Sequence, residues 1–346
     1  MNNSSRGRIK CLVWDLDNTL WRGVLSEGDS VSVLPQIRHL IATLDQRGIL
    51  QSIASKNDAV PALALLREFG LAEYFLYPEI NWGAKSQSIK RIAERINIGI
   101  DSIAFVDDQA FERDEVAFAL RNVFCIDMAD IETIADMEEF NPRFLTDESG
   151  TRRQMYLLDS ERCKAEENFA GPQEEFLASL KMIFTISRAA LNDLERLEEL
   201  TARTNQLNTT GYIYSYEELD FFRTSETHLL LVAALDDKYG AYGKIGLTLI
   251  EKNGRDWKIK LMLMSCRVMS RGVGTVLLNH VMRLARAAGV TLRAEMIPNE
   301  RNRMMLLTYK FAGFTPIEKV ETMEVFEHTL HTIPAIPGYI ELVSEA

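Results

Sequence analysis

Two pairs of aspartates are the first feature of this sequence that could do chemistry. Asp15 and Asp17 directly follow an apolar run at residues 9–14, and Asp107 and Asp108 follow another at residues 102–106. Short apolar runs of this kind are typical of buried parallel strands. Carboxylate oxygens are the ligands that Mg²⁺ prefers, and a carboxylate can also act as a nucleophile or as a general acid and base. The two pairs therefore predict a magnesium-dependent phosphotransfer site.

Further polar residues follow or precede the predicted elements in the order that such a site needs. Ser55, Lys56 and Asn57 come after a strand at residues 49–54, and Lys85 precedes a helix at residues 86–96. A lysine can neutralise the charge of a phosphoryl group. Taken alone, each feature has a plainer explanation: the aspartates as a turn and helix cap, Lys85 as a solvated side chain, Ser55 as a turn residue. The complete set is difficult to explain as caps.

The elements that must position these residues alternate between strands and helices. We expect strands at residues 9–14, 49–54, 102–106 and 123–126, and helices at 36–47, 58–69 and 86–96. Such alternation predicts a doubly wound α/β domain. In an open sheet of this class the ligand crevice lies at the carboxyl ends of the strands. The aspartates, Ser55 and Lys85 should therefore meet at one edge.

The rest of the chain has a different pattern. Residues 129–181 are acidic and helical, and we interpret them as a connector. Strands are expected at 228–235, 245–250, 257–264, 291–297 and 321–328, with helices at 274–288 and 306–311. This order predicts an α+β domain. The predicted organisation is 1–130 as the first domain, 131–180 as a helical connector and 181–346 as the second domain.

The aspartate, serine and lysine motifs resemble those of the haloacid dehalogenase superfamily. The resemblance implies a Rossmannoid domain in which Asp15 is the nucleophile that becomes an aspartyl phosphate and Asp17 is the general acid and base. Residues 21–34 leave room for a flap but not for a full cap domain, so we expect a minimal cap. The further residues that the resemblance implies are Ser55, Lys56 and Asn57 for binding phosphate, Lys85 for stabilising it, and Asp15, Asp17 (through its carbonyl), Asp107 and Asp108 for holding Mg²⁺.

A second group of candidate residues lies between a predicted strand and a long helix. Cys266 is flanked by Arg267 and Arg271, and Gly272 and Gly274 follow. A cysteine near cationic side chains and a helix N-terminus should have a lowered pKa and a more nucleophilic thiolate. The alternative is a small buried core residue. The glycine turn can offer backbone N–H groups to a phosphate or a pantetheine arm, or it can simply make the turn.

Residues 267–314 are similar to the acetyltransferase fold of the GNAT superfamily, although Ser270 stands where its signature has a glycine. The whole chain resembles the FkbH-like glyceryl transferase/phosphatases of polyketide antibiotic biosynthesis, of tetronate or methoxymalonyl type. The segments that carry this likeness are 14–21, 55–57, 105–108, 203–210 and 265–269. Such proteins take 1,3-bisphosphoglycerate, remove phosphate, hold glycerate as a thioester on a cysteine and pass it to an acyl carrier protein.

The FkbH-like resemblance places the thioester on Cys266 and implies substrate binding by Asn205, Arg267 and Arg271. The stretch 205–210 is equally well explained as a solvated loop. His280 is expected on a helix surface rather than as the catalytic base. Two competing hypotheses remain: a phosphatase fused to a CoA-dependent acyltransferase, with Cys266 structural, and a non-catalytic docking module.

The composition narrows the classes of partner. The net charge of −11 argues against general nucleic-acid binding, which needs a basic surface. No apolar run reaches the roughly 18 residues of a membrane helix, and no signal peptide precedes the first strand, so we expect a cytoplasmic protein that binds no membrane. Seven arginines of the second domain predict a local basic face for an acidic carrier protein: Arg267, Arg271, Arg283, Arg286, Arg293, Arg301 and Arg303.

Overall fold

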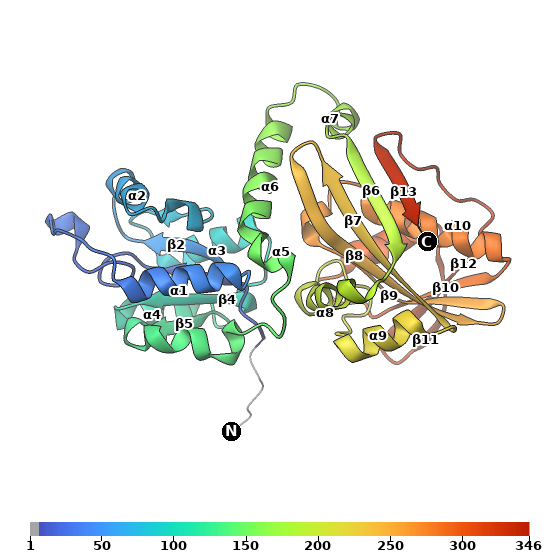
Figure 1. Ribbon diagram of the computed structural model, residues 1–346, viewed down its shortest axis with the longest axis horizontal. Helices are drawn as coiled ribbons and strands as arrows, with labels where there is room; N and C mark the ends of the chain where they lie inside the picture. The colour runs from blue at the N-terminus through green and yellow to red at the C-terminus, as the bar shows by residue number, and fades with distance from the viewer. Residues whose placement is uncertain (1–6, 346) are drawn as a thin grey trace. The chain divides into compact units, whose positions relative to one another are not determined.

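The computed structural model describes residues 7–345 and divides the chain into two compact units, Met1–Leu157 and Leu158–Ala346 (Figure 1). The boundary lies inside helix α6 (Arg152–Glu167), in the segment predicted to be a connector. Each unit has its own hydrophobic core. The part of the chain that the structure describes contains no helix long and apolar enough to cross a membrane.

A five-stranded parallel sheet forms the centre of the first unit. Its strand order is β3-β2-β1-β4-β5. Every residue of the central strand β1 is fully buried, as expected of a parallel strand covered on both faces. This order confirms the predicted doubly wound α/β class. The strands are β1 (Cys11–Trp14), β2 (Leu50–Ser55), β3 (Glu79–Ile80), β4 (Ile103–Asp107) and β5 (Phe124–Asp127).

Helices cover both faces of this sheet through apolar stripes. Helices α1 (Pro35–Gln46) and α2 (Ala59–Glu68) pack with Leu12 and Trp14 on one face. Helices α3 (Lys85–Ile96) and α4 (Ala110–Ala119) pack with Cys11 and Val13 on the other. Neighbouring β1 residues point to opposite faces because side chains alternate along a strand.

Helices connect β5 to β6 along the chain. They are η4 (Met128–Asp136), η5 (Glu138–Phe140), α5 (Asp147–Gly150), α6 and α7 (Gln173–Ser179). The helical character predicted for this region is therefore confirmed. Arg153 of α6 forms an ion pair with Asp45 at 2.9 Å, which fixes the start of α6 on the first unit.

The second unit is built on an eight-stranded mixed sheet of order β11-β12-β10-β9-β8-β7-β6-β13. Strands β6 to β9 form an antiparallel meander, β10 runs parallel to β9, and β13 runs parallel to β6. This confirms the predicted α+β class. The strands are β6 (Met182–Arg188), β7 (His228–Asp237), β8 (Gly240–Asn253), β9 (Asp256–Met264), β10 (Thr291–Met296), β11 (Thr315–Val320), β12 (Met323–His328) and β13 (Ile340–Glu345).

Helices also cover both faces of the second sheet. Helices α10 (Val273–Ala288) and α11 (Arg303–Phe311) contribute to the larger core. Leu194, Leu197 and Leu200 of α8 (Leu194–Arg203) and Leu219 of α9 (Tyr216–Thr224) belong to the core on the other face. The buried leucines of α8 are three residues apart, as the 3.6-residue helical period requires.

Candidate functional site

The side chain of Lys85 joins two buried aspartates at the carboxyl ends of the central strands. Its Nζ donates to Asp15 Oδ1 at 2.8 Å and also to Asp107 Oδ2. The three side chains are 4%, 6% and 0% exposed. Asp15 follows β1, Asp107 ends β4, and Lys85 opens α3, so three separate elements meet here. The predicted meeting of these residues at one sheet edge is confirmed.

This cluster has one cation for two buried carboxylates. Burial raises the pKa of Asp15 to about 6, although Lys85 opposes the rise; Asp107 adds to it, and a hydrogen bond from Ser55 lowers it. Burial also raises the pKa of Asp107, again against the pull of Lys85. For Lys85, burial by itself would lower the pKa, but the two carboxylates outweigh it and the pKa is raised. The site therefore favours further positive charge.

Asp15, Asp107 and Asp108 form a group that fits a divalent cation. Each offers one carboxylate oxygen, and these oxygens lie within 4.8 Å of one another. Oxygen donors and an excess of buried negative charge are what Mg²⁺ requires. The backbone N–H of Asp108 donates to Thr19 Oγ1 at 3.0 Å, which fixes the loop after β4 against the loop after β1. These three aspartates would hold the magnesium ion predicted from the sequence.

The carboxylate of Asp17 points elsewhere, toward a set of hydrogen-bond donors. Its Oδ1 accepts from Trp21 Nε1 at 2.7 Å and from the backbone N–H of Leu25 at 3.2 Å. Its Oδ2 accepts from Asn57 Nδ2 at 3.0 Å. The side chain of Asp17 is therefore not part of the group formed by Asp15, Asp107 and Asp108. The expected magnesium contact through its backbone carbonyl stays a prediction.

Residues 55–57 have three different roles in the structure. Ser55 is buried beside Asp15, and Asn57 holds Asp17. Lys56 forms an ion pair with Glu112 of α4 at 2.6 Å. Adjacent residues of an extended segment point to opposite sides, so Lys56 diverges from Ser55. Phosphate binding by Lys56 or Asn57 stays a prediction.

The segment after Asp17 forms a small flap. Arg22 and Ser32 exchange backbone hydrogen bonds of 2.9 and 3.3 Å, and a single 3₁₀ turn, η1 (Leu25–Glu27), lies between them. A cavity of about 230 Å³ opens at its base. The cavity is lined by Asn18, Thr19, Leu20, Trp21, Arg22, Leu34, Ile37 and Met128.

Cys266 lies half-buried at the start of a 3₁₀ helix, η7 (Cys266–Val268), directly after β9. The arginines that flank it are buried and paired. Arg267 lies 4.0 Å from Asp159 and donates to the carbonyl of Tyr242 at 2.8 Å, and Arg271 donates to Glu166 at 2.9 Å. Their positive charges are thus compensated by carboxylates of α6. Less net positive charge therefore acts on the Cys266 thiol than the sequence predicted.

Arg267 and Arg271 must also be removed from the predicted basic face. Their side chains are 8% and 5% exposed, so neither presents its charge to solvent. The sequence pattern was misleading because their acidic partners lie about a hundred positions earlier in the chain. Arg286, Arg301 and Arg303 are exposed and remain candidates for this face.

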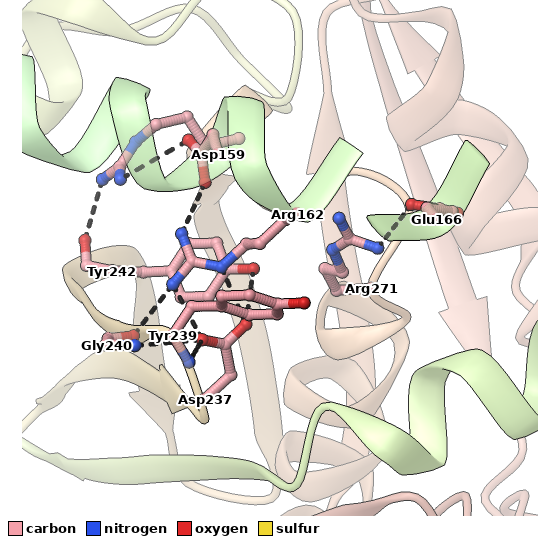
Figure 2. Close-up of polar contacts among 9 residues, drawn as sticks. Asp159, Arg162, Glu166, Asp237, Tyr239, Gly240, Tyr242 and Arg271 are labelled. Atoms are coloured by element: carbon pink, nitrogen blue, oxygen red, sulfur yellow. Dashed lines mark hydrogen bonds and ion pairs between the residues drawn. The ribbon is translucent and has the colours of Figure 1, made fainter. Parts of the chain in front are cut away.

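A neighbouring buried arginine holds α6 to the second sheet. Figure 2 shows the guanidinium of Arg162 between Asp159 and Asp237, with bonds of 2.8 Å to each. It also lies 3.9 Å from the centre of the Tyr242 ring. Asp237 in turn accepts from the backbone N–H of Tyr239. The hairpin turn between β7 and β8 is therefore part of a buried ion-pair network.

The glycine turn before α10 is covered by an aromatic residue. Gly272 is the N-cap of α10 with φ +77°, and a Cβ atom there would lie 2.9 Å from the Tyr339 hydroxyl. Gly274 lies in the first turn of α10. Pantetheine binding by Gly272 and Gly274 stays a prediction.

The middle of the stretch 205–210, residues 207–209, is buried and bonded to the second sheet. Residues 207–209 lie between β9 and β10 beyond the part where these strands pair. Thr209 N donates to the carbonyl of Met262 at 3.1 Å, and Ile297 N donates to the carbonyl of Thr209 at 2.9 Å. Asn302 Nδ2, fully buried, donates to the carbonyls of Asn208 and Ile297 at 3.0 and 2.9 Å. The solvated-loop alternative is therefore wrong for residues 207–209, while Asn205 is exposed.

An open polar pocket of about 380 Å³ lies at the outer end of this stretch. It is lined by Asn205, Gly211, Asn299, Glu300 and Arg301. Asn205 therefore faces a pocket, as a substrate-binding residue would need to do, although the role itself stays a prediction. His280 is buried on α10, not on the helix surface as expected. Burial, helped by Arg283, lowers the pKa of His280.

Comparisons with known proteins gave matches among solved structures. No protein-family model and no curated protein sequence matches the chain. One similar structure is the N-terminal part of the protein BF1531 from Bacteroides fragilis, containing a phosphatase domain complexed with Mg, with 26% identity and a TM-score of 0.35. The match covers 40% of this chain and 41% of that one, so the chain spans less than half the length of this neighbour.

Two other similar structures are acetyltransferases. The ribosomal-protein-S18-alanine N-acetyltransferase from Escherichia coli is 15% identical, with a TM-score of 0.34, over 42% of this chain and 92% of its own. The GNAT domain of S. lividans PAT is 19% identical, with a TM-score of 0.34, over 41% of this chain and 88% of its own.

Proposed function

We propose that the chain is a bifunctional enzyme: a magnesium-dependent phosphatase and an acyl transferase that loads glycerate from 1,3-bisphosphoglycerate onto an acyl carrier protein in polyketide biosynthesis, in the cytoplasm. The observation that carries the phosphatase half is the buried cluster of Asp15, Lys85 and Asp107, with Asp108 beside it. Burying two carboxylates with a single lysine costs stability. A cluster that costs stability and has the oxygen donors to hold a cation is typical of a functional site.

The residues of the first unit can divide the phosphatase reaction between them. A carboxylate oxygen of Asp15 attacks phosphorus and the bond to the leaving oxygen breaks, while Asp17 gives that oxygen a proton. Water then attacks the aspartyl phosphate, Asp17 takes its proton back, and phosphate leaves with the carboxylate of Asp15 restored. Lys85 holds Asp15 and offsets charge on the phosphoryl oxygens. A magnesium ion on Asp15, Asp107 and Asp108 would offset further phosphoryl charge.

The transferase half rests on Cys266 and on the FkbH-like resemblance. A thiolate at Cys266 attacks the carbonyl carbon of the acyl phosphate, the carbon–oxygen bond to phosphate breaks, and a thioester forms. The thiol of a carrier protein then attacks the thioester and restores Cys266. An acyl phosphate is already activated, so this route requires no ATP. The partial exposure of Cys266 is compatible with such access.

A CoA-dependent acyltransferase with a structural Cys266 is the second candidate. The observation in its favour is the glycine-capped N-terminus of α10, a sixteen-residue helix whose first N–H groups suit a phosphate. The pairing of Arg271 with Glu166 leaves less positive charge for a pyrophosphate at this end.

Intact-mass spectrometry after adding 1,3-bisphosphoglycerate tests the proposal. We expect a glyceryl or phosphoglyceryl adduct on the wild-type protein that is absent from Cys266→Ala and present in the matched control Cys163→Ala, which removes an exposed thiol of α6. Asp15→Asn should abolish release of the ester phosphate, so its adduct should be phosphoglyceryl only. An adduct that survives Cys266→Ala would contradict the transferase half alone, and a glyceryl adduct on Asp15→Asn would contradict the phosphatase half.

The carrier protein is proposed to dock on the exposed arginines near the pocket of Asn205. Arg301 lines that pocket and Arg303 begins α11. Charge reversal at both positions should raise the KM for carrier protein about tenfold or more, the effect of roughly 1.4 kcal/mol of lost attraction, with phosphate release unchanged. Arg255→Glu, at an exposed site in the turn between β8 and β9 that is not part of the predicted basic face, is the control. Equal loss in the control, or equal loss of both activities, would count against this docking surface.

A further inference from the structure

The tryptophan at the base of the flap is the best-placed residue that the proposed chemistry does not yet use. Trp21 is 1% exposed, yet its one polar atom is directed at Asp17 and not at solvent or a backbone carbonyl. We infer that Trp21 is a positioning residue for proton transfer: its indole N–H fixes the carboxylate of Asp17 so that one oxygen, Oδ2, faces the reaction. This inference rests on the proposed phosphatase function and adds a residue to it.

The hydrogen bonds to Asp17 distinguish its two oxygens. Oδ1 accepts two, from Trp21 Nε1 at 2.7 Å and from the Leu25 N–H at 3.2 Å. Neither of these donors can accept a hydrogen bond, so a proton on Oδ1 would face two N–H groups. Oδ2 accepts one, from Asn57 Nδ2 at 3.0 Å. Oδ2 is therefore the oxygen that can exchange a proton with a leaving group or a water molecule.

The local fold leaves the indole little freedom to move. The backbone N–H of Trp21 donates to the carbonyl of Leu16 at 3.1 Å, which closes a tight turn around Asp17. The ring packs edge-on against Phe69 with centroids 6.4 Å apart, inside the core of the first unit. A short hydrogen bond from a buried, immobile donor to a carboxylate is among the stronger contacts that proteins make. The core thus sets the orientation of Asp17.

The proton movements assigned to Oδ2 balance over the two steps. In the first, Asp15 bonds to phosphorus, the bond from phosphorus to the leaving oxygen breaks, and the proton on Oδ2 goes to that oxygen. In the second, the oxygen of water bonds to phosphorus, the phosphorus–Asp15 bond breaks, and a proton of that water goes to Oδ2. A carboxylate turned away by even about 1 Å would slow both steps, by up to about a hundredfold.

Trp21→Phe tests the inference, because it deletes the N–H and keeps an aromatic ring. We expect kcat for hydrolysis of the phosphate ester to fall at least tenfold, while KM stays within a factor of two of the wild-type value. Both steps need the same Oδ2, so intact mass during a single turnover should show slower phosphorylation of Asp15 and slower loss of the phosphoryl group than in the wild type. A kcat within a factor of two of wild type in a folded variant would overturn the inference.

Two other tryptophans serve as matched controls. The indole of Trp82 donates to Asp58 at 3.2 Å on the surface, so Trp82→Phe deletes the same kind of bond away from Asp17 and should leave kcat unchanged. The indole of Trp14 is fully buried and donates to Gln51 at 3.1 Å. Trp14→Phe measures the stability lost when a buried indole bond is removed, and Trp21→Phe should lose a similar amount.

A measurement that does not depend on enzyme activity keeps the inference testable if Trp21→Phe does not fold. The chain has four tryptophans, so its ¹⁵N–¹H spectrum has four indole signals. Asp17→Asn should move the Trp21 signal by far the most, because that indole loses its charged acceptor. Four unmoved signals would overturn the inference. If the wild-type protein releases no phosphate, the proposed function fails while this spectrum still decides whether Trp21 holds Asp17.

Discussion

At the scale of single residues, Lys85 has the largest expected effect on the free energy of unfolding of the first unit. It is the cation between Asp15 and Asp107, and all three side chains are buried. Lys85→Met should destabilise the first unit by about 3–5 kcal/mol, because it leaves two buried carboxylates unpaired. Arg91→Gln, which breaks an ion pair with Glu79 on a 42% exposed side chain, should cost about 0–1 kcal/mol. Urea unfolding measures both.

Magnesium should partly rescue the Lys85→Met variant. A divalent ion on the aspartates supplies the positive charge that the variant lacks, so its midpoint of unfolding should rise more with added Mg²⁺ than that of the wild type. An equal rise in the two proteins would show that Lys85 and the metal act on different groups.

The residues that could be predicted from the sequence are those that follow strand ends. Asp15, Ser55 and Asp107 are such residues, because the carboxyl ends of parallel strands meet at one edge of the sheet. The contacts of Trp21 and Asn57 with Asp17 depend on how a loop closes, which no periodic pattern encodes. The pairing of Arg271 with Glu166 joins residues 105 positions apart, and a sequence pattern contains no information on such a distance.

At the scale of elements, the two helix ends at Gly48 and Gly70 offer a matched test of backbone strain. Both have positive φ, +67° and +66°, but a Cβ at Gly48 would lie 2.9 Å from Ser149 Cα while one at Gly70 meets nothing within 4 Å. Gly70→Ala should cost about 1–2 kcal/mol from the left-handed conformation alone. Gly48→Ala should cost a further 1–3 kcal/mol, roughly, from overpacking. Equal losses of unfolding free energy for the two variants in urea would show that α5 moves aside for the new methyl group at no cost in free energy.

Helix α10 should make the stability of the second unit depend on pH. His280 is buried and its pKa is lowered, first by burial and then by Arg283. The unfolded chain therefore binds a proton near its ordinary pKa, about 6.5, while the folded chain stays neutral. The stability is fully present above that pH and is lost as the pH falls below it. His280→Gln should flatten this loss in thermal unfolding; His39→Gln, at an exposed site on α1, should not. An unchanged slope in His280→Gln would contradict the assignment.

Some of the elements missed in the sequence have weak apolar patterns. Every residue of β11 is exposed, and β13 has one buried residue, so neither shows an inward face. In α4 the buried positions are Glu112 and Val116, and the short β3 has one. Strand β6 and helix α8 do carry periodic apolar residues and could have been found, whereas α9 has one buried residue, Leu219. The long central elements, with many buried positions, were predicted because burial is what creates the pattern.

At the scale of the whole molecule, the two units have separate cores and separate buried ion-pair networks. Units of this kind usually unfold as distinct transitions. The metal group is in the first unit and the Arg162 network in the second. Each network should therefore control one transition in calorimetry.

Magnesium and Arg162 should thus act on different transitions. A ligand that binds the folded state alone stabilises it by about 2.7 kcal/mol at a hundred times its Kd, so Mg²⁺ should raise the first-unit transition, and Asp107→Asn should abolish the rise. Arg162→Met leaves the fully buried Asp237 without its guanidinium, at a cost of about 3–5 kcal/mol, and should lower the other transition. A single transition that moves with both changes would mean that the chain unfolds as one cooperative body, because neither network could then be assigned to a unit of its own.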